Sequence, residues 1–161
     1  MAFDWGVRKG LDVFIELAKR LGREKYQIVL VGTDEKVDRQ LPENIISIHR
    51  TQNQAELAEI YTAADLFVNP TREDNYPTVN MEAIACGPPV LTFRTGGSSE
   101  TIDETCGYVV DCDDIGAMEK TILQCFGIGT NSTTDYCNRA NDFDMVKKYE
   151  EYIYLYKELT H

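Results

Sequence analysis

The sequence predicts an α/β domain built on a doubly wound parallel sheet, and two observations lead to this fold class. Short apolar, often β-branched runs alternate with stretches of helical periodicity along the 161 residues. The connections between them are short, which is typical of strands joined by crossover helices. Because we find no internal repeat and no linker, we expect one Rossmann-like domain over residues 1–161.

The first half of the chain predicts two helices and three strands. Residues 11–21 place apolar side chains at i, i+3, i+4, i+7 and i+10, which is one face of a helix. The unbroken apolar run 26–33 predicts a strand buried on both faces, and 45–50 repeats the signal more weakly. A capping box opens a helix over 53–64, and 65–71 forms a third strand.

The second half continues the alternation. In chain order it predicts a helix near 78–86, strands at 89–93 and 107–110, a helix from Asp113 or Asp114 through Phe126, and a last helix over about 143–159. Residues 131–140 carry an ambiguous signal.

Composition excludes several classes of protein. The formal net charge is -11, and only the segment of the first 25 residues has a net positive charge. A general nucleic-acid binder is therefore not expected. No run approaches the roughly 20 apolar residues of a membrane span, and the N-terminus lacks a signal-peptide pattern. We therefore expect a soluble, cytoplasmic chain. Five cysteines without a C-x-x-C pair and two histidines predict reduced thiols and no metal site.

Two carboxylates and a helix start are the first candidate site. Asp74 lies in a loop after an expected strand, and Glu82 lies on the helix that follows. Pro77 suits the first position of that helix, because its missing N–H would be unpaired there. The amides of Thr78 and Val79 can then face an anion such as a diphosphate. Beside phosphates, the two carboxylates make sense as acceptors for neutral sugar hydroxyls.

Two further segments supply cations and glycines. Arg8 and Lys9 precede the first helix, where Lys9 can reach a phosphate as a point charge while Gly10 lets the backbone approach. Gly96 and Gly97 follow an expected strand and offer amides that can approach a sugar closely. Each signal alone is weak, and their joint placement at one edge of the sheet carries the hypothesis.

Three segments carry a family resemblance: "RKGLDVFIELAKRL", "DLFVNPTREDNYPTVNMEAIACGPPV" and "FRTGGSSE". In this order and spacing they resemble the donor-binding half of the family-four retaining nucleotide-sugar glycosyltransferases. The most specific element is the acidic-x7-acidic pattern that runs into residues 82–90. The resemblance covers nearly the whole chain and implies the C-terminal half of a GT-B enzyme, whose N-terminal domain holds the acceptor.

The resemblance also implies residue roles. Substrate-binding roles fall to Arg8, Lys9, Thr78, Val79, Gly96 and Gly97. Asp74 would hold hydroxyls of the donor sugar and Glu82 the ribose, and we take these two as the candidate catalytic carboxylates. The loop of His49, Arg50 and Thr51 would lie near the base.

The implied function is sugar transfer from a UDP-, GDP- or ADP-sugar to a glycan acceptor, as in bacterial surface polysaccharide synthesis. It needs no cofactor. The implied partners are the nucleotide sugar and an acceptor domain outside this chain, with peripheral membrane contact by the full enzyme. We expect the isolated chain to be inactive.

Three departures keep alternatives open. Asp74 stands where Glu is common, Asp4 where an Arg is often found, and Ser99 where Pro is frequent. The shorter carboxylate of Asp74 bears on sugar preference. Asp4 and Ser99 favour, as the alternative function, a non-catalytic binding module with a degenerate donor site. An unrelated doubly wound regulator is a third interpretation. Taken singly, Glu82 can be a solvated helix residue, and Lys9 a surface charge.

Aromatic residues line one side of the last expected helix. Tyr149, Tyr152 and Tyr156, with Phe143, predict packing rather than recognition. In the resembling family this helix commonly crosses back to the other domain, which would leave part of the stripe exposed in this chain.

Overall fold

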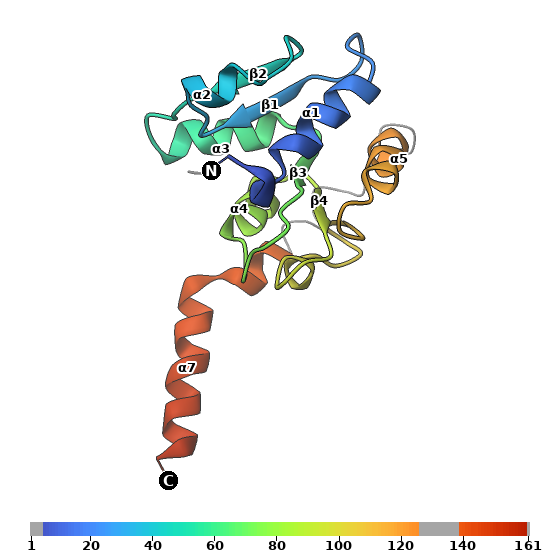
Figure 1. Ribbon diagram of the computed structural model, residues 1–161. Coiled ribbons are helices and arrows are strands. Elements are labelled where there is room, and N and C mark those ends of the chain that lie inside the picture. The colour runs from blue at the N-terminus through green and yellow to red at the C-terminus, as the bar shows by residue number, and fades with distance from the viewer. Residues whose placement is uncertain (1–4, 126–138, 161) are drawn as a thin grey trace.

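The computed structural model describes residues 5–125 and 139–160 and confirms the alternating α/β fold (Figure 1). Every strand pair that forms is parallel. The strands are β1 (Ile28–Val31), β2 (Ile45–Ile48), β3 (Phe67–Asn69), β4 (Val90–Phe93) and β5 (Gly107–Val110). The α-helices are α1 (Leu11–Arg20), α2 (Glu35–Asp38), α3 (Gln54–Ala63), α4 (Thr78–Cys86), α5 (Ile115–Cys125) and α7 (Met145–Leu159). Short 3-10 turns are η1 (Val7–Lys9), η2 (Ser99–Thr101) and η3 (Asn141–Phe143).

The helix predictions hold closely, because caps and breakers fix helix ends locally. The bounds of α4 are those predicted, and Asn53 caps α3 by accepting from the Glu56 amide at 2.9 Å. Asp114 likewise accepts from the Ala117 amide ahead of α5. The single-turn helix α2 was not predicted, since four residues are too short to show a period. Phe126 and most of 131–140 lie outside the described residues.

The sheet is divided, which the sequence did not indicate. Strands β1 and β2 form one pair, and β3, β4 and β5 form a second sheet in that order. The prediction that β1 is buried on both faces is wrong, because Val29 is 41% exposed. Its register partner Ile46 is 49% exposed on the same face. The paired part of β1 is also shorter than the apolar run that predicted it.

Three apolar clusters form the core. The first joins α1 to β4 and α5 and includes Leu17 and Phe93, which are both almost fully buried. The second packs α1 on β1 and α2 around Leu30. The third packs α3 and α4 on β4 through Tyr61 and Ile84. Helices therefore cover both faces of the strands, and the strand ends are left for the loops.

The segment before α1 lies at the carboxyl ends of two strands. The indole Nε1 of Trp5 donates to the carbonyl of Val31, the last residue of β1, at 3.3 Å. Farther along, the Arg72 amide donates to the Arg8 carbonyl at 2.9 Å, in the loop that follows β3. The N-terminal segment thus spans the edge where ligands gather in open α/β sheets.

Helix α7 extends away from the rest of the chain (Figure 1). None of its residues is buried, and Tyr149, Tyr152 and Tyr156 are 61–66% exposed. The prediction that this stripe packs is therefore wrong for the described part of the chain, because all three tyrosines are exposed there. Phe143 does pack, since it contacts the third cluster and lies 4.9 Å from the guanidinium of Arg139.

Two global expectations concern thiols and membranes. In the described part of the chain, Cys86, Cys106, Cys112 and Cys125 are free, and Cys137 lies outside it. Burial raises the pKa of the Cys106 thiol. No helix within residues 5–125 or 139–160 combines the length and hydropathy needed to cross a bilayer.

Candidate functional site

The centre of the candidate site is an ion pair between two predicted residues. Lys9 Nζ lies 2.6 Å from Asp74 Oδ2, and the two side chains are 21% and 20% exposed. Lys9 closes the turn η1, and Asp74 lies in the loop after β3. Partial burial reduces solvent screening, so this pair is stronger than a fully exposed one.

Close backbone contact places Lys9 beside that loop. Gly10 has φ 77°, and a Cβ on it would lie 2.4 Å from the carbonyl oxygen of Pro70. Any other residue would therefore push the turn away from the loop. Arg8 is more exposed, and its Nη1 lies 3.5 Å from the Glu73 carbonyl, at the limit of a hydrogen bond.

Arg72 ties four segments together at this edge. Its Nη1 and Nη2 donate to both carboxylate oxygens of Asp12 at 2.8 and 2.7 Å, and its Nε donates to Asp113 at 2.7 Å. Nη1 also donates to the Val7 carbonyl. The hydrogen bond from Arg72 holds the pKa of Asp12 below its ordinary value. Sequence reasoning missed Arg72, because its partners lie 60 and 41 positions away.

Gly96 and Gly97 brace the acidic loop. Gly96 has φ 46°, and a Cβ on it would lie 2.1 Å from the Asp74 carbonyl oxygen. A Cβ on Gly97 would lie 2.0 Å from the Asn75 carbonyl oxygen, and the Gly97 amide donates to the Asp74 carbonyl at 3.3 Å. The contacts made by these glycines are with the backbone that carries Asp74.

Helix α4 begins at Thr78, directly after the acidic loop. Pro77 is the N-cap, with φ −68° and ψ 112°, so the prediction that it takes the first helical position is wrong by one residue. Its extended ψ keeps it outside the helix. The first amides of a helix lack acceptors within it, and those of Thr78 and Val79 are two of these. Val79 is half-buried.

A buried polar network supports this helix start. Asn80 is fully buried, accepts from Asn69 Nδ2 at 2.8 Å and donates to Thr101 Oγ1 at 2.9 Å. It also reaches Ser98 Oγ at 3.2 Å, and Ser98 bonds Thr92 Oγ1 at 2.7 Å. The network joins β3, β4, α4 and the glycine loop. Asn80 was missed, although an Asn amid apolar helix residues was an available signal.

Glu82 has a different environment from Asp74. It is exposed on α4 and accepts a 3.3 Å hydrogen bond from the hydroxyl of Tyr61 on α3. Burial, with the nearby Glu82 charge, raises the pKa of Tyr61. The structure therefore brings Arg8, Lys9, Asp74, Gly96 and Gly97 into one loop cluster, whereas the hydrogen bond of Glu82 points to α3.

A polar cluster lies at the carboxyl ends of β1 and β2. Asp38 accepts from Ser47 Oγ at 2.5 Å and contacts His49 Nε2 at 2.6 Å. Ser47 in turn bonds the hydroxyl of Thr33 at 2.5 Å. The hydrogen bond to Asp38 raises the pKa of His49, and those from Ser47 and His49 lower the pKa of Asp38. Of the other loop residues, Arg50 is exposed and Thr51 is buried.

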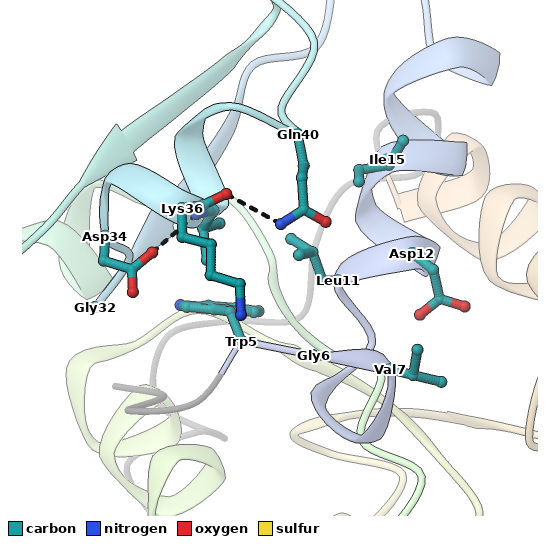
Figure 2. A pocket seen from close by; sticks show the side chains of 11 residues that line it. Trp5, Gly6, Val7, Leu11, Asp12, Ile15, Gly32, Asp34, Lys36 and Gln40 are labelled. Carbon is teal, nitrogen blue, oxygen red and sulfur yellow. Dashed lines mark hydrogen bonds between the residues drawn. The ribbon is translucent and has the colours of Figure 1, made fainter.

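A cavity of about 350 Å³ lies beside the loop cluster of Lys9 and Asp74 rather than in it (Figure 2). Trp5 lines it, together with Asp12 of α1, Lys36 of α2 and Gln40 just after α2. The Gln40 amide donates to the Lys36 carbonyl at 3.0 Å. None of the predicted site residues lines this cavity.

The parallel strands, the helices on both faces and the loop cluster at the strand ends define a Rossmann-like α/β domain of the kind found in GT-B enzymes. The family model described as "Glycosyl transferases group 1" matches residues 2–127. The chain therefore belongs to the group 1 glycosyl transferases.

Individual relatives are glycosyltransferases. The GDP-mannose-dependent monoacylated alpha-(1-6)-phosphatidylinositol monomannoside mannosyltransferase of Corynebacterium glutamicum is 26% identical over 132 residues, covering 73% of this chain and 34% of that protein. The D-inositol 3-phosphate glycosyltransferase of Mycolicibacterium smegmatis is 38% identical over 74 residues, covering 45% of this chain and 17% of that protein. This chain thus spans about a third or less of these relatives.

Solved structures show the same fold. Sucrose-phosphate synthase from Thermosynechococcus elongatus superposes with a TM-score of 0.82 at 23% identity, over 96% of this chain and 43% of that one. HepE from Anabaena in complex with UDP-glucose superposes with a TM-score of 0.77 at 16% identity, over 96% of this chain and 46% of that one.

Proposed function

We propose that this chain is the sugar-nucleotide-binding domain of a retaining glycosyltransferase that transfers a hexose to a glycan acceptor. The observation that carries the proposal is the Lys9–Asp74 pair, held at the strand ends between the start of α4 and the glycine loop. A cation, free helix amides and a carboxylate are the groups that a nucleotide diphosphate sugar needs together.

Each group has a distinct task in this proposal. The ammonium of Lys9, with Arg8 and the amides of Thr78 and Val79, neutralises the diphosphate. Asp74 accepts hydrogen bonds from hydroxyls of the donor sugar. Because Lys9 and Asp74 pair with each other, donor binding redirects both groups: the ammonium turns toward a phosphate while the carboxylate turns toward the sugar.

Residues of α3, α4 and the glycine loop complete the proposed donor site. Glu82 accepts from the ribose, and Tyr61 orients it through their hydrogen bond. Gly96 and Gly97 line the sugar pocket and hold the loop of Asp74 in place. The loop of His49, Arg50 and Thr51 lies near the base of the nucleotide.

Two relatives support the proposed donor class. The Corynebacterium glutamicum protein is named for its use of GDP-mannose, and HepE was solved with UDP-glucose. We propose a UDP-, GDP- or ADP-sugar as the donor, and a cytoplasmic enzyme that builds a glycan such as a surface polysaccharide.

A second domain would hold the acceptor. The exposed tyrosines of α7 support this, because a large apolar surface on a projecting helix is typical of an interface. We propose that the stripe of Tyr149, Tyr152 and Tyr156 docks on that acceptor domain. Peripheral contact with a membrane belongs to the full enzyme.

The alternative is a non-catalytic module that has kept the fold but lost tight donor binding. The closed Lys9–Asp74 pair favours it, since a cation already neutralised within the chain attracts a phosphate less strongly.

A thermal-shift screen separates the two proposals. The 161-residue chain would be heated with UDP-glucose, GDP-mannose and ADP-glucose, with free glucose as the control. A ligand at about 100 times its dissociation constant adds roughly 2.7 kcal/mol of stability, so one of the three should raise Tm clearly. Unchanged Tm with every sugar nucleotide at millimolar concentration would support the degenerate module.

The isolated chain should bind donor and transfer nothing. Transfer requires the acceptor within about 3–3.5 Å of the reacting carbon, and in this proposal another domain supplies the acceptor. The measurement is turnover of a radiolabelled sugar nucleotide by residues 1–161. Slow hydrolysis is compatible with the proposal, whereas efficient transfer to a glycan by this chain alone would contradict it.

A further inference from the structure

The cavity of about 350 Å³ between α1 and α2 is not used by the donor site proposed above (Figure 2). Its volume lies within the range of about 300–1,000 Å³ that is typical of small-molecule sites. Gly32, which directly follows β1, lines it, so the cavity lies at the same strand-end edge as the donor site. The turn η1 borders both places, because Val7 lines the cavity while Lys9 pairs with Asp74.

An aromatic ring in a fixed position forms one side of the cavity. The indole Nε1 of Trp5 donates to the Val31 carbonyl at 3.3 Å. The same ring packs edge to face with buried Phe14, with ring centroids 5.8 Å apart and planes at 75°. Figure 2 shows the indole nearly edge-on below the gap between the two helices, so one of its faces is turned to the cavity. A rigid aromatic face offers a large apolar contact at little entropic cost.

Polar groups with spare hydrogen-bonding capacity line the α2 side. Asp34 uses Oδ1 to accept from the Val37 amide at 2.8 Å, and Gln40 uses its amide nitrogen to donate to the Lys36 carbonyl at 3.0 Å. Within the described part of the chain, the second Asp34 oxygen, the Gln40 amide oxygen and the Lys36 ammonium make no further hydrogen bond. The cavity thus offers two acceptors and one donor beside an aromatic face.

The charges around the cavity balance, which favours a neutral ligand over an ion. Both carboxylate oxygens of Asp12 accept from Arg72, at 2.8 and 2.7 Å, so this carboxylate is already paired. Asp34 and Lys36 carry opposite charges on the same side of the cavity. The remaining walls are apolar and consist of Leu11, Ile15 and Val37. The matching ligand is uncharged, with an apolar face and hydroxyl groups around its edge.

We infer that this cavity binds one neutral pyranose ring, and that the ring is a unit of the acceptor glycan. The C–H groups of a pyranose form an apolar face that stacks on Trp5. Its hydroxyls donate to Asp34 and Gln40, and one of them accepts from Lys36. Neither the Lys9–Asp74 pair nor the start of α4 lines the cavity, so the bound ring is not the donor sugar.

The assignment to a glycan rests on the proposed function, whereas the sugar site rests on the cavity alone. Because η1 separates the cavity from the donor groups, the ring bound here is remote from the hydroxyl that receives the new sugar. The site would therefore hold an acceptor that is long enough to pass over this turn.

The test uses Trp5 as the reporter, because it is the single tryptophan of the chain. The 161-residue chain would be titrated with the methyl glycosides of glucose, mannose, galactose and N-acetylglucosamine, and the tryptophan fluorescence and the indole N–H signal followed. Sorbitol, which has hydroxyls but no ring, is the control. At least one glycoside should give a saturable change, and sorbitol none. Because one ring makes few contacts, its dissociation constant should be about 1–30 mM.

Variants on the α2 side test the contacts. Gln40→Met should weaken binding of that glycoside about two- to tenfold, and Lys36→Met at least about tenfold, because each removes a hydrogen bond. Gln124→Met is the matched control, since Gln124 is exposed on α5 and does not line the cavity. All three side chains are exposed, so Tm should change little and the variants should stay folded.

Three results would overturn the inference: no saturable change with any of the four glycosides, an equal change with sorbitol, or unaltered affinity in both cavity variants. A saturable response to uridine, guanosine or adenosine, with none to the glycosides, would also overturn it and identify a nucleobase site. Nucleotide binding is measured separately, from the amide shifts of Lys9 and Thr78 with UDP. If glycosides bind while no sugar nucleotide shifts those amides, the sugar site stands and its assignment to an acceptor glycan falls.

Discussion

The ammonium of Lys9 lies 2.6 Å from the carboxylate of Asp74, although 65 positions separate them along the chain. The pair joins the turn before α1 to the loop after β3, and two backbone approaches hold these segments together: Gly10 on Pro70 and Arg72 on Arg8. Two residues predicted from separate motifs are thus one electrostatic unit, and changing either one alters the other.

Carboxylate variants should separate sugar from nucleotide recognition. Asp74→Asn should weaken binding of a nucleotide sugar but not of the nucleotide diphosphate, because the sugar loses its acceptor while Lys9 is released toward the phosphates. Glu82→Gln should weaken both ligands. Since a hydrogen bond to a charged group contributes about 1.5–3 kcal/mol, each loss should be roughly ten- to hundredfold. Calorimetric titration measures it, and equal, negligible effects would identify both as solvated surface residues.

Lys9→Met should remove the phosphate contact and keep most of the side-chain volume. We expect nucleoside diphosphate to bind at least about tenfold more weakly, and the salt dependence of binding to fall, because one charge contact is lost. Lys120→Met is the matched control, since Lys120 is exposed on α5. An equal loss in both variants would assign the effect to net charge rather than to the site.

Gly96→Ala should destabilise the fold and the donor site together. At φ 46° the new Cβ would lie 2.1 Å from the Asp74 carbonyl oxygen, so the loop must move. A strained backbone of this kind costs about 1–3 kcal/mol, which urea unfolding detects. Gly22→Ala is the control, because nothing lies within 4 Å of its Cβ position. Equal stability of the two variants would contradict the loop geometry.

The Asp38–His49 pair should make stability depend on pH. Asp38 raises the pKa of His49 above its ordinary value of 6.5, so the pair's contribution is full below that pH and is lost as pH rises through the raised pKa. At the acid end, the pKa of Asp38 lies below its ordinary value of 3.8, so the contribution is full above pH 3.8 and is lost as pH falls through the lowered pKa. Wild type should therefore exceed His49→Gln in stability most at about pH 5.5 and least at about pH 9.

The control for this pH dependence is the Asp38→Asn background. There the effect of His49→Gln on stability should differ much less between the two pH values, because the partner that raises the pKa of His49 most is gone. The remaining carboxylates Asp34 and Glu35 raise the pKa of His49 less than Asp38 does. A pH-dependent difference that is undiminished without Asp38 would contradict the pairing.

The sequence predicted those features that depend on local signals. Helix α4 was predicted near its observed bounds because Pro77 precedes it and Gly87 ends it, and two separate motifs placed Lys9 and Asp74 at the same edge of the sheet. Arg72 could not be predicted, since its role depends on Asp12 and Asp113 from distant segments. The divided sheet was not predicted either, because the apolar run of β1 signals a buried strand without specifying its neighbours.

The exposed side chains of Glu82 and α7 show a second limit of sequence reasoning. Periodicity indicates which face of a helix is apolar, but it does not state what covers that face. Periodicity alone therefore could not show that the tyrosines of α7 are exposed. Likewise, the motif placed Glu82 on a helix beside the site, but its hydrogen bond to Tyr61 depends on how α3 packs against α4.

Mapping a sugar nucleotide onto the backbone amides tests the central proposal most directly. Isotope-labelled chain would be titrated with UDP-glucose, GDP-mannose and ADP-glucose, and amide chemical shifts followed. The account predicts saturable shifts for at least one donor, concentrated at the amides of Lys9, Gly10, Thr78, Val79, Gly96 and Gly97, and their loss with Lys9→Met. Saturable shifts confined to the α1–α2 cavity, or no shifts at millimolar concentration with any of the three, would contradict a donor site at the Lys9–Asp74 pair.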